Sequence, residues 1–197
     1  MSEQPTAARR SRFTPLRAAQ LHGAVLGLLR EVGYDALSMD AVAARARFSK
    51  ATLYRQWGGK PQLVVAALQF HRPMRIDTID TGSLRGDLDA LAALTGHRAV
   101  AGDVALQLGV GRAIYDHPEL RRTLREVMLH PALDDLHAIL QRGVDRGEVA
   151  PDCPALDMVP QLLCSLVIAR PLLSDEAMTE TEFRRNLEAL VFPALHI

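Results

Sequence analysis

The sequence has few of the residues that build disulfide-bonded or metal-binding folds. Only two cysteines occur, Cys153 and Cys164, and their spacing fits neither a metal-ligand pattern nor a disulfide framework. His97, His130 and His137 are scattered along the chain, so we expect no metal and no cofactor. Free thiols indicate a reducing compartment and predict a cytoplasmic protein, with a redox switch through them as the alternative.

Long apolar runs are also missing. The most apolar stretch, residues 158 to 173, contains Pro160, Gln161, Arg170 and Pro171 and is too short and too interrupted to span a bilayer. The first residues, MSEQPTAARRSRF, have no apolar core and do not resemble a signal peptide. We therefore expect no membrane partner.

Strand patterns are absent too, because no stretch alternates apolar and polar residues between hairpin turns. Ala, Leu, Arg and Glu are abundant, and these residues favour helix, so the predicted fold class is all-α. Apolar stripes and capping residues predict helices over residues 15–32, 38–46, 49–57, 60–71, 83–100, 103–115, 132–146, 155–169 and 179–192. Gly33 is placed to end the first of them in the left-handed conformation.

Two further helix starts carry the pattern of a capping box. Asp116 precedes Glu119 by three residues, and Thr179 precedes Glu182 by three residues. Pro131 is expected to break or kink the chain between them.

Charge is balanced over the chain but unevenly distributed. Residues 1–60 contain ten Lys or Arg and four acids, for a net +6, whereas residues 61–197 contain thirteen and nineteen, for a net −6. A basic first third indicates an anionic partner for that part alone, although uneven surface charge is a simpler explanation. A DNA binder without sequence preference is disfavoured because its basic surface should extend over the acidic remainder as well.

The segment from Gly33 to Leu63 predicts a helix-turn-helix. Two short helices are separated by Arg47-Phe48-Ser49, and each has only one thin apolar side. The outer face of the second helix carries hydrogen-bond donors around one small residue: Lys50, Ala51, Thr52, Tyr54, Arg55 and Gln56. A helix whose first residues enter the major groove of DNA needs such a face.

The string GYDALSMDAVAARARFSKATLYRQWGGKPQL, residues 33–63, resembles the DNA-binding signature of TetR-type regulators. Many positions match in register, including the Gly33-Tyr34 pair, Ser49-Lys50 and Thr52-Leu53-Tyr54. Ala51 stands where many relatives have glycine, and Trp57 stands where phenylalanine is commoner.

This resemblance implies a ligand-responsive repressor that binds a pseudo-palindromic operator in double-stranded DNA as a homodimer and is released by a small-molecule effector. The DNA contacts it implies are Ser38, Ser49, Lys50, Ala51, Thr52, Tyr54, Arg55 and Lys60. Tyr54, Lys60 and Ser38 are expected to bind phosphates, while Lys50, Ala51, Thr52 and Arg55 are expected to read base edges. Ser38 and Ser49 could equally be helix caps and nothing more.

The remainder of the chain is predicted to bind an effector and to form the dimer. The implied organisation is a flexible basic arm over residues 1–12, a DNA-binding domain over 13–60, and a helical effector-binding and dimerisation domain over 61–197. Within the last of these, TGSLRGDLDAL and LQRGVDRGEV resemble one C-terminal subgroup of the same family. That resemblance implies an inner ligand cavity and a dimer built from the last two helices.

Two sets of residues are candidates for these roles. The candidates for the ligand cavity are Met74, Leu106, Val110, Tyr115, Met128, Gln161 and Cys164. The candidates for the dimer interface are Leu156, Val159, Leu163, Leu166, Phe183, Leu187, Leu190 and Val191. For both sets, ordinary burial within one monomer is the alternative.

The chain shows no catalytic motif. It has no glycine-rich phosphate loop after a strand, no nucleophile elbow and no metal-spaced cluster, so we expect no enzyme. A helical enzyme or small-molecule carrier with a vestigial helix-turn-helix is the competing interpretation. A convergent set of polar residues would favour it.

Overall fold

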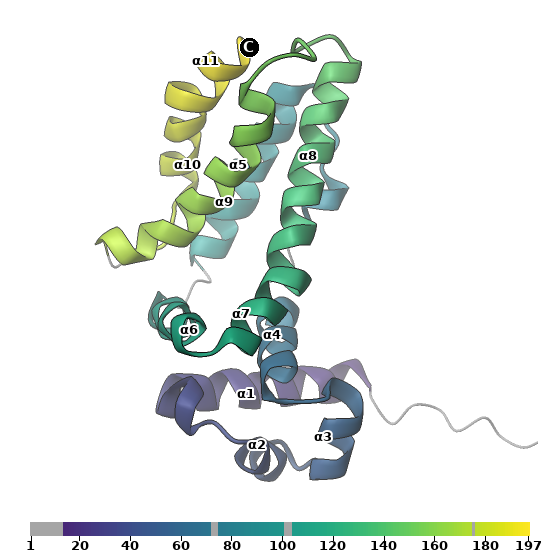
Figure 1. Cartoon of the computed structure of the whole chain (residues 1–197), viewed down its shortest axis with the longest axis vertical. Coiled ribbons are helices and arrows are strands. Elements are labelled where there is room, and N and C mark those ends of the chain that lie inside the picture. The colour runs from purple at the N-terminus through teal and green to yellow at the C-terminus, as the bar shows by residue number, and fades with distance from the viewer. Residues whose placement is uncertain (1–13, 72–74, 101–103, 175) are drawn as a thin grey trace, which may run out of the picture.

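The computed structural model describes residues 14–71, 75–100, 104–174 and 176–197. Within these ranges every regular element is a helix, which confirms the all-α prediction. The molecule is elongated, with α1 to α3 forming a head at one end, α6 and α7 lying on it, and α5 and α8 to α11 extending to the other end (Figure 1). The expected basic arm, residues 1–12, and the ligand candidate Met74 fall outside the described residues.

The first part of the chain follows the predicted helices closely. Its elements are α1 (Pro15–Ala36), α2 (Met39–Ala46), α3 (Lys50–Trp57) and α4 (Lys60–His71). Thr14 caps α1 by accepting a hydrogen bond from Arg17 N at 3.3 Å. Gly33 has a φ of 73°, a left-handed value that glycine adopts at little cost, and it interrupts the helical path of α1 three residues before Ala36.

The second part of the chain follows the predicted helices less closely. Its elements are α5 (Leu84–Val100), α6 (Val104–Asp116), α7 (Pro118–Leu124), α8 (His130–Asp145), α9 (Ala155–Ser174), α10 (Glu180–Asn186) and α11 (Phe192–Leu195). A 3₁₀ turn, Ile76–Thr78, precedes α5, and π-helical turns at Arg125–Leu129 and Leu187–Val191 join α7 to α8 and α10 to α11. Helix α9 continues to Ser174 rather than residue 169, through Pro160 and Pro171.

Of the break or kink predicted at Pro131, the break does not occur. The chain stays helical from α7 into α8, and Pro131 lies in the first turn of α8 directly after the π-helical turn. A proline in an α-helix clashes with the carbonyl four residues earlier. Here that carbonyl belongs to Val127, inside the wider π turn, so the helix accommodates the ring.

One of the two capping boxes is present and the other is not. Thr179 Oγ1 accepts from Glu182 N at 3.2 Å, and Glu182 Oε2 accepts from Thr179 N at 3.1 Å, as predicted. The box expected at Asp116 and Glu119 is wrong, because α7 begins after His117 and no side chain caps it. The residue before a proline is forced into extended backbone, so His117 takes the capping position and Asp116 stays in the last turn of α6.

Two hydrophobic cores hold the described chain together. One lies among α5 and α8 to α11, where Leu84, Ile139 and Phe183 are buried. The other lies in the head and includes Leu106 and Leu120 from α6 and α7. The head therefore shares its core with elements well beyond residue 60. Within the described ranges, no helix combines the length and apolar character needed to cross a bilayer.

The two C-terminal segments singled out in the sequence meet around one buried carboxylate. Asp87 in α5 is fully buried, and its Oδ1 accepts hydrogen bonds from Thr81 N at 2.6 Å and Thr81 Oγ1 at 2.8 Å. Its Oδ2 lies 3.6 Å from Nη2 of Arg142 in α8 and of Arg146, the residue that follows α8. A buried charge needs such partners, so the cluster ties the start of α5 to the end of α8.

Candidate DNA-binding face

Two serines begin the helices of the head's helix-turn-helix. Ser38 Oγ accepts from Ala41 N at 3.1 Å, and Ser49 Oγ accepts from Thr52 N at 3.2 Å, so both are helix caps. The Ser49 and Thr52 hydroxyls also lie 2.7 Å apart and share a hydrogen bond. Because a cap uses the hydroxyl only as an acceptor, the proton of Ser38 can still be donated to an anion at the positive end of α2.

The core of the head fixes the orientation of α3. Leu53 is fully buried and Trp57 is half-buried. The ring of Trp57 packs edge-on against His22 of α1, with 6.1 Å between ring centroids. Arg47 ends α2 in the left-handed region at a φ of 55°, and this sets the turn into α3. With Leu53 and Trp57 held inward, the opposite side of α3 faces outward.

That outer side is polar and accessible. Ala51 and Arg55 are exposed, Tyr54 is 45% exposed, and Thr52 is half-buried beside its Ser49 partner. Lys50 Nζ donates to Asp40 Oδ2 at 2.8 Å, and this hydrogen bond raises the pKa of the lysine. The ion pair with Asp40 was not foreseen, because the two residues belong to different helices.

Two arginine side chains around the motif, those of Arg45 and Arg17, interact with the head itself. Arg45 donates to both carboxylate oxygens of Glu31, at 2.8 and 2.6 Å, and these bonds lower the pKa of Glu31. The guanidinium of Arg17 lies 4.7 Å from the centroid of the Phe48 ring and donates to Arg47 O at 3.3 Å. No local spacing in the sequence indicates these pairs, since their partners come from other turns of the head.

Lys60, at the start of α4, lies against the corner that follows Gly33. Its Nζ donates to Asp35 O at 3.2 Å and lies 4.2 Å from the centroid of the Tyr34 ring. Burial lowers the pKa of Lys60, with the Asp35 carboxylate acting in the opposite direction. The ammonium group has three N–H donors, so the contact with Asp35 leaves two for an external acceptor.

The predicted ligand residues do not line one cavity. Leu106 and Val110 are buried in the core shared with the head, Met128 packs against that core, and Cys164 packs against the other. Burial raises the pKa of the Cys164 thiol. These positions belong to two separate parts of the molecule.

Two of the ligand candidates are exposed to solvent in the single chain, and their assignment to a ligand cavity stays a prediction. Tyr115 is 79% exposed, because α6 buries Ala113 against the head and a residue two positions later points to the opposite side. Gln161 is exposed for the same reason, since it lies between the buried residues Val159 and Leu163 of α9.

The described residues enclose hollows in at least two places. One of about 290 Å³ lies between α1 and α6, and Leu106 lines it together with Leu29, Arg30, Gly33, Tyr34, Ala105 and Gly109. Another of about 540 Å³ lies between the end of α8 and the start of α9, where Leu156 contributes to its wall. Leu106 is thus the one predicted ligand residue that borders either of them.

Most of the predicted dimer residues are buried within a single chain. Val159, Leu163, Phe183, Leu187 and Val191 are at most 3% exposed, so they cannot contact a partner and their assignment is wrong. They fill the core because α9 and α10 pack against α5 and α8 through these faces. Leu190 is 49% exposed, and Leu156 and Leu166 are half-buried, so these three remain candidates.

Comparison with known families agrees with the geometry of the head. Residues 24–67 match the family described as bacterial regulatory proteins, tetR family, and residues 78–190 match the tetracyclin repressor-like C-terminal domain. The chain belongs to the TetR family and is a DNA-binding transcriptional regulator.

Individual relatives support this membership. An uncharacterised HTH-type transcriptional regulator of Mycobacterium tuberculosis is 34% identical over 184 residues, covering 91% of this chain and 88% of the relative. The DNA-binding transcriptional repressor TetR of Mycobacteroides abscessus is 39% identical over 137 residues, covering 69% of this chain and 72% of that protein. The crystal structure of the regulator FadR from Bacillus subtilis in complex with stearoyl-CoA shares the fold, with a TM-score of 0.67 and 19% identity over 87% of this chain and 96% of that one.

Proposed function

We propose that the protein is a repressor that binds a pseudo-palindromic operator as a homodimer and releases it when a small molecule binds. It acts by binding and not by catalysis, and its place of action is the cytoplasm, where bacterial DNA lies. The observation that carries the proposal is the exposed polar side of α3, held outward by the buried Leu53.

In this proposal α3 enters the major groove. Arg55 or Lys50 pairs with guanine O6 and N7, and Ala51 or the Thr52 methyl contacts a thymine methyl. Lys50 reaches DNA by exchanging its Asp40 partner for a base or a phosphate. A mobile ion pair at the surface contributes little to stability, so the exchange costs little.

The phosphate contacts flank the groove. Tyr54 is exposed on α3, Ser38 lies at the N-terminus of α2, and Lys60 lies at the start of α4. Ser49 is also at a helix N-terminus, although its hydroxyl is shared with Thr52. Phosphate contacts of this kind set the register of a protein on the duplex and carry no sequence information themselves.

The dimer interface proposed here uses the exposed side of α9 in place of its buried side. Large apolar side chains on α9 are open to solvent in the single chain, with Met158 67%, Leu162 36%, Ile168 52% and Leu173 82% exposed. They fall on one half of the helix, since successive helical residues advance by about 100°. An apolar surface of this kind indicates a protein contact, and a two-fold axis lets it cover itself.

The effector is proposed to bind in the C-terminal helices and to favour a spacing of the two heads that no longer fits the operator. The FadR relative is described with bound stearoyl-CoA, which supports a ligand site in this fold. Coupling of this kind is reciprocal, so operator DNA weakens effector binding by the same factor. An effector that binds without changing DNA affinity contradicts this part of the proposal.

The proposal is tested by selecting duplexes that bind the protein from a random pool and then titrating the recovered sequence at several salt concentrations. Recovery of an inverted repeat, bound by dimers at least about 10³-fold more tightly than random DNA, supports a specific repressor. Recovery of no common sequence, with only weak and salt-sensitive binding, contradicts specific recognition by the head.

A further inference from the structure

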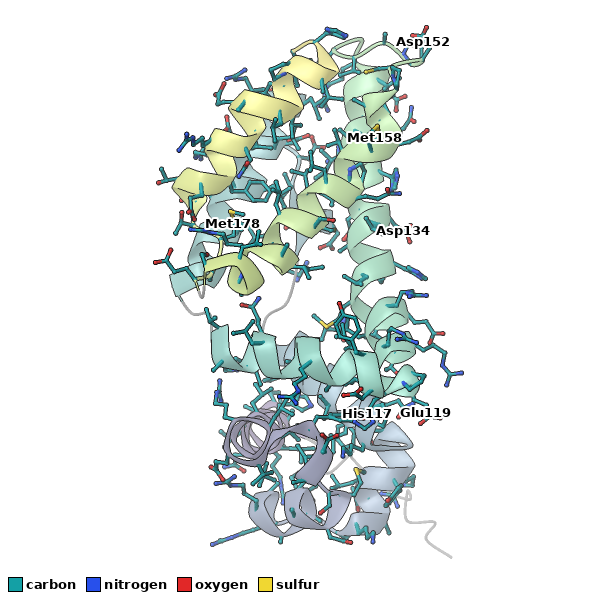
Figure 2. The ribbon with its side chains drawn as sticks, turned by 60° about the vertical axis from the view of Figure 1, so that its left-hand side comes forward. His117, Glu119, Asp134, Asp152, Met158 and Met178 are labelled. Atoms are coloured by element: carbon teal, nitrogen blue, oxygen red, sulfur yellow. The ribbon has the colours of Figure 1, made fainter. Side chains whose placement is uncertain are left out.

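Four residues form a contact between the head and the effector domain, and we call them the joint cluster: Tyr34, Asp35, Lys60 and His117. His117 Nε2 donates to Asp35 Oδ1 at 2.5 Å. Its ring packs against Tyr34 with 4.7 Å between centroids. Figure 2 shows His117 and Glu119 at the level where α6 and α7 meet the head.

The corner that carries Tyr34 and Asp35 has little freedom of its own. Gly33 turns the backbone out of α1 at a φ of 73°, and Tyr34 is 6% exposed between α1 and His117. Burial, followed by the charges of Glu119 and Asp35, raises the pKa of Tyr34 to about 12, so its ring stays neutral. Because Gly33 has turned this corner out of the regular helix, its position is held by the side chains that pack against it, His117 and Lys60.

Lys60 contacts both residues of the same corner. Its ammonium group donates to the Asp35 carbonyl and lies over the Tyr34 ring, while His117 contacts the Asp35 carboxylate and packs against the same Tyr34 ring. His117 of the effector domain is thus connected to Lys60 through two residues, Tyr34 and Asp35. Lys60 is the proposed phosphate ligand of α4, so the inference that follows rests on that proposed role.

We propose that His117 is a positioning residue for DNA binding, which fixes from the effector domain the point at which Lys60 meets a backbone phosphate. With His117 in place, the corner is held and the ammonium group is already ordered when DNA arrives. Without His117, the Lys60 side chain must become ordered when DNA binds, and this entropy cost lowers the affinity for DNA. A shift of α7 moves His117, and the phosphate contact weakens with it.

The test is a double-mutant cycle on the full chain. The quantity measured is the affinity for a random-sequence duplex of about 30 base pairs. This probe needs no operator, because phosphate contacts are the same in every sequence. Lys60→Ala is expected to weaken binding and to reduce the salt slope by about 0.9. His117→Ala is expected to weaken binding about three- to tenfold when Lys60 is present and less than about twofold when it is not, as for residues coupled by contact.

Two further variants separate positioning from general damage. His117→Gln keeps a nitrogen donor near the position of Nε2, so it should retain part of the affinity that His117→Ala loses. His117 makes no side-chain capping bond to α7, so neither change removes a cap. His130→Ala makes the same chemical change at an exposed histidine outside the joint cluster, and it should leave DNA affinity unchanged. Thermal unfolding of each variant checks that the fold is intact.

The outcomes distinguish the inference from the function on which it rests. Equal losses from His117→Ala with and without Lys60, or no loss in either case, overturn the positioning role while leaving the phosphate role of Lys60 intact. An unchanged affinity and salt slope for Lys60→Ala overturn both. If His117→Ala does not fold, His117→Gln and Asp35→Asn take its place in the cycle and the same comparison decides.

Discussion

At the scale of single residues, contacts to base edges and contacts to phosphates should respond differently to mutation. Arg55→Ala or Thr52→Ala should relax the preference for one base pair, at a cost of about 1–3 kcal/mol against the preferred sequence and little against others. Lys60→Ala should weaken binding to all sequences alike. Binding titrations on the recovered operator and on single-base variants measure both effects. Identical behaviour of the two classes of variant would show that the contacts are wrongly assigned.

A second residue-scale prediction concerns His22. It is 7% exposed, packs against Phe70 with 4.5 Å between ring centroids, and has no hydrogen-bond partner for either ring nitrogen among the described residues. Burial lowers its pKa from 6.5, so the unfolded chain takes up a proton at a higher pH than the native head does. Acid therefore favours unfolding, and the full stability is present above about pH 6.5 and declines below it.

The measurement compares free energies of unfolding for the wild type and His22→Leu at about pH 7.5 and about pH 5.5. Leucine cannot be protonated and suits the apolar surroundings, so the variant should lose less stability on acidification than the wild type. Since every other residue is the same in both proteins, the difference between their free energies of unfolding isolates the contribution of His22. If the difference in free energy of unfolding between the two proteins is the same at both pH values, protonation of His22 does not destabilise the head.

At the scale of elements, the close approach of α5 and α8 can be tested at Gly143. A Cβ built there would lie 2.7 Å from Leu84 Cδ2 and 3.2 Å from Leu84 Cβ, closer than packed atoms allow. Gly143→Ala should therefore lower the free energy of unfolding by about 1–3 kcal/mol, as overpacking does. Gly111→Ala in α6 is the matched control, because a Cβ there meets nothing within 4 Å and alanine favours helix by about 0.5–1 kcal/mol. Chemical denaturation measures both, and equal effects of the two changes would refute the steric explanation.

Elements and their caps could be predicted from sequence where the determining residues are neighbours in the chain. Ser38, Ser49 and Thr179 each cap through a bond to the residue three positions later, so a local pattern contains all the information. The helix break predicted at Pro131 is wrong because the effect of a proline depends on whether the preceding turn can widen, and no residue type specifies that.

The contacts that complete the site could not be predicted in this way. His117 meets Asp35 across 82 positions of sequence, and Lys50 meets Asp40 across two helices. The buried faces of α9 and α10 were assigned to a partner chain because an apolar helix looks the same whether its own chain or another covers it. The structure resolves this choice, since Phe183 and Leu187 are covered by α5 and their own neighbours.

At the scale of the whole molecule, the exposed side of α9 predicts a dimer that single charges can break. Leu162→Glu or Ile168→Glu should give monomers in sedimentation experiments, because a carboxylate would be buried without a partner at the two-fold contact. Tyr115→Glu, at a more exposed position on α6, should leave the dimer intact. Variants of α9 that remain dimeric would exclude this side of the helix as the interface.

Hydroxyl-radical footprinting of the operator recovered from the random pool tests dimeric recognition most directly. Two copies of α3 placed in successive major grooves should protect two patches on one side of the duplex, with centres about 34 Å apart, or one helical turn. Lys60→Ala should weaken both patches equally, since the two halves of a symmetric dimer make the same contacts. A single protected patch, or protection spread evenly along the duplex, would contradict binding of an inverted repeat by two matched heads.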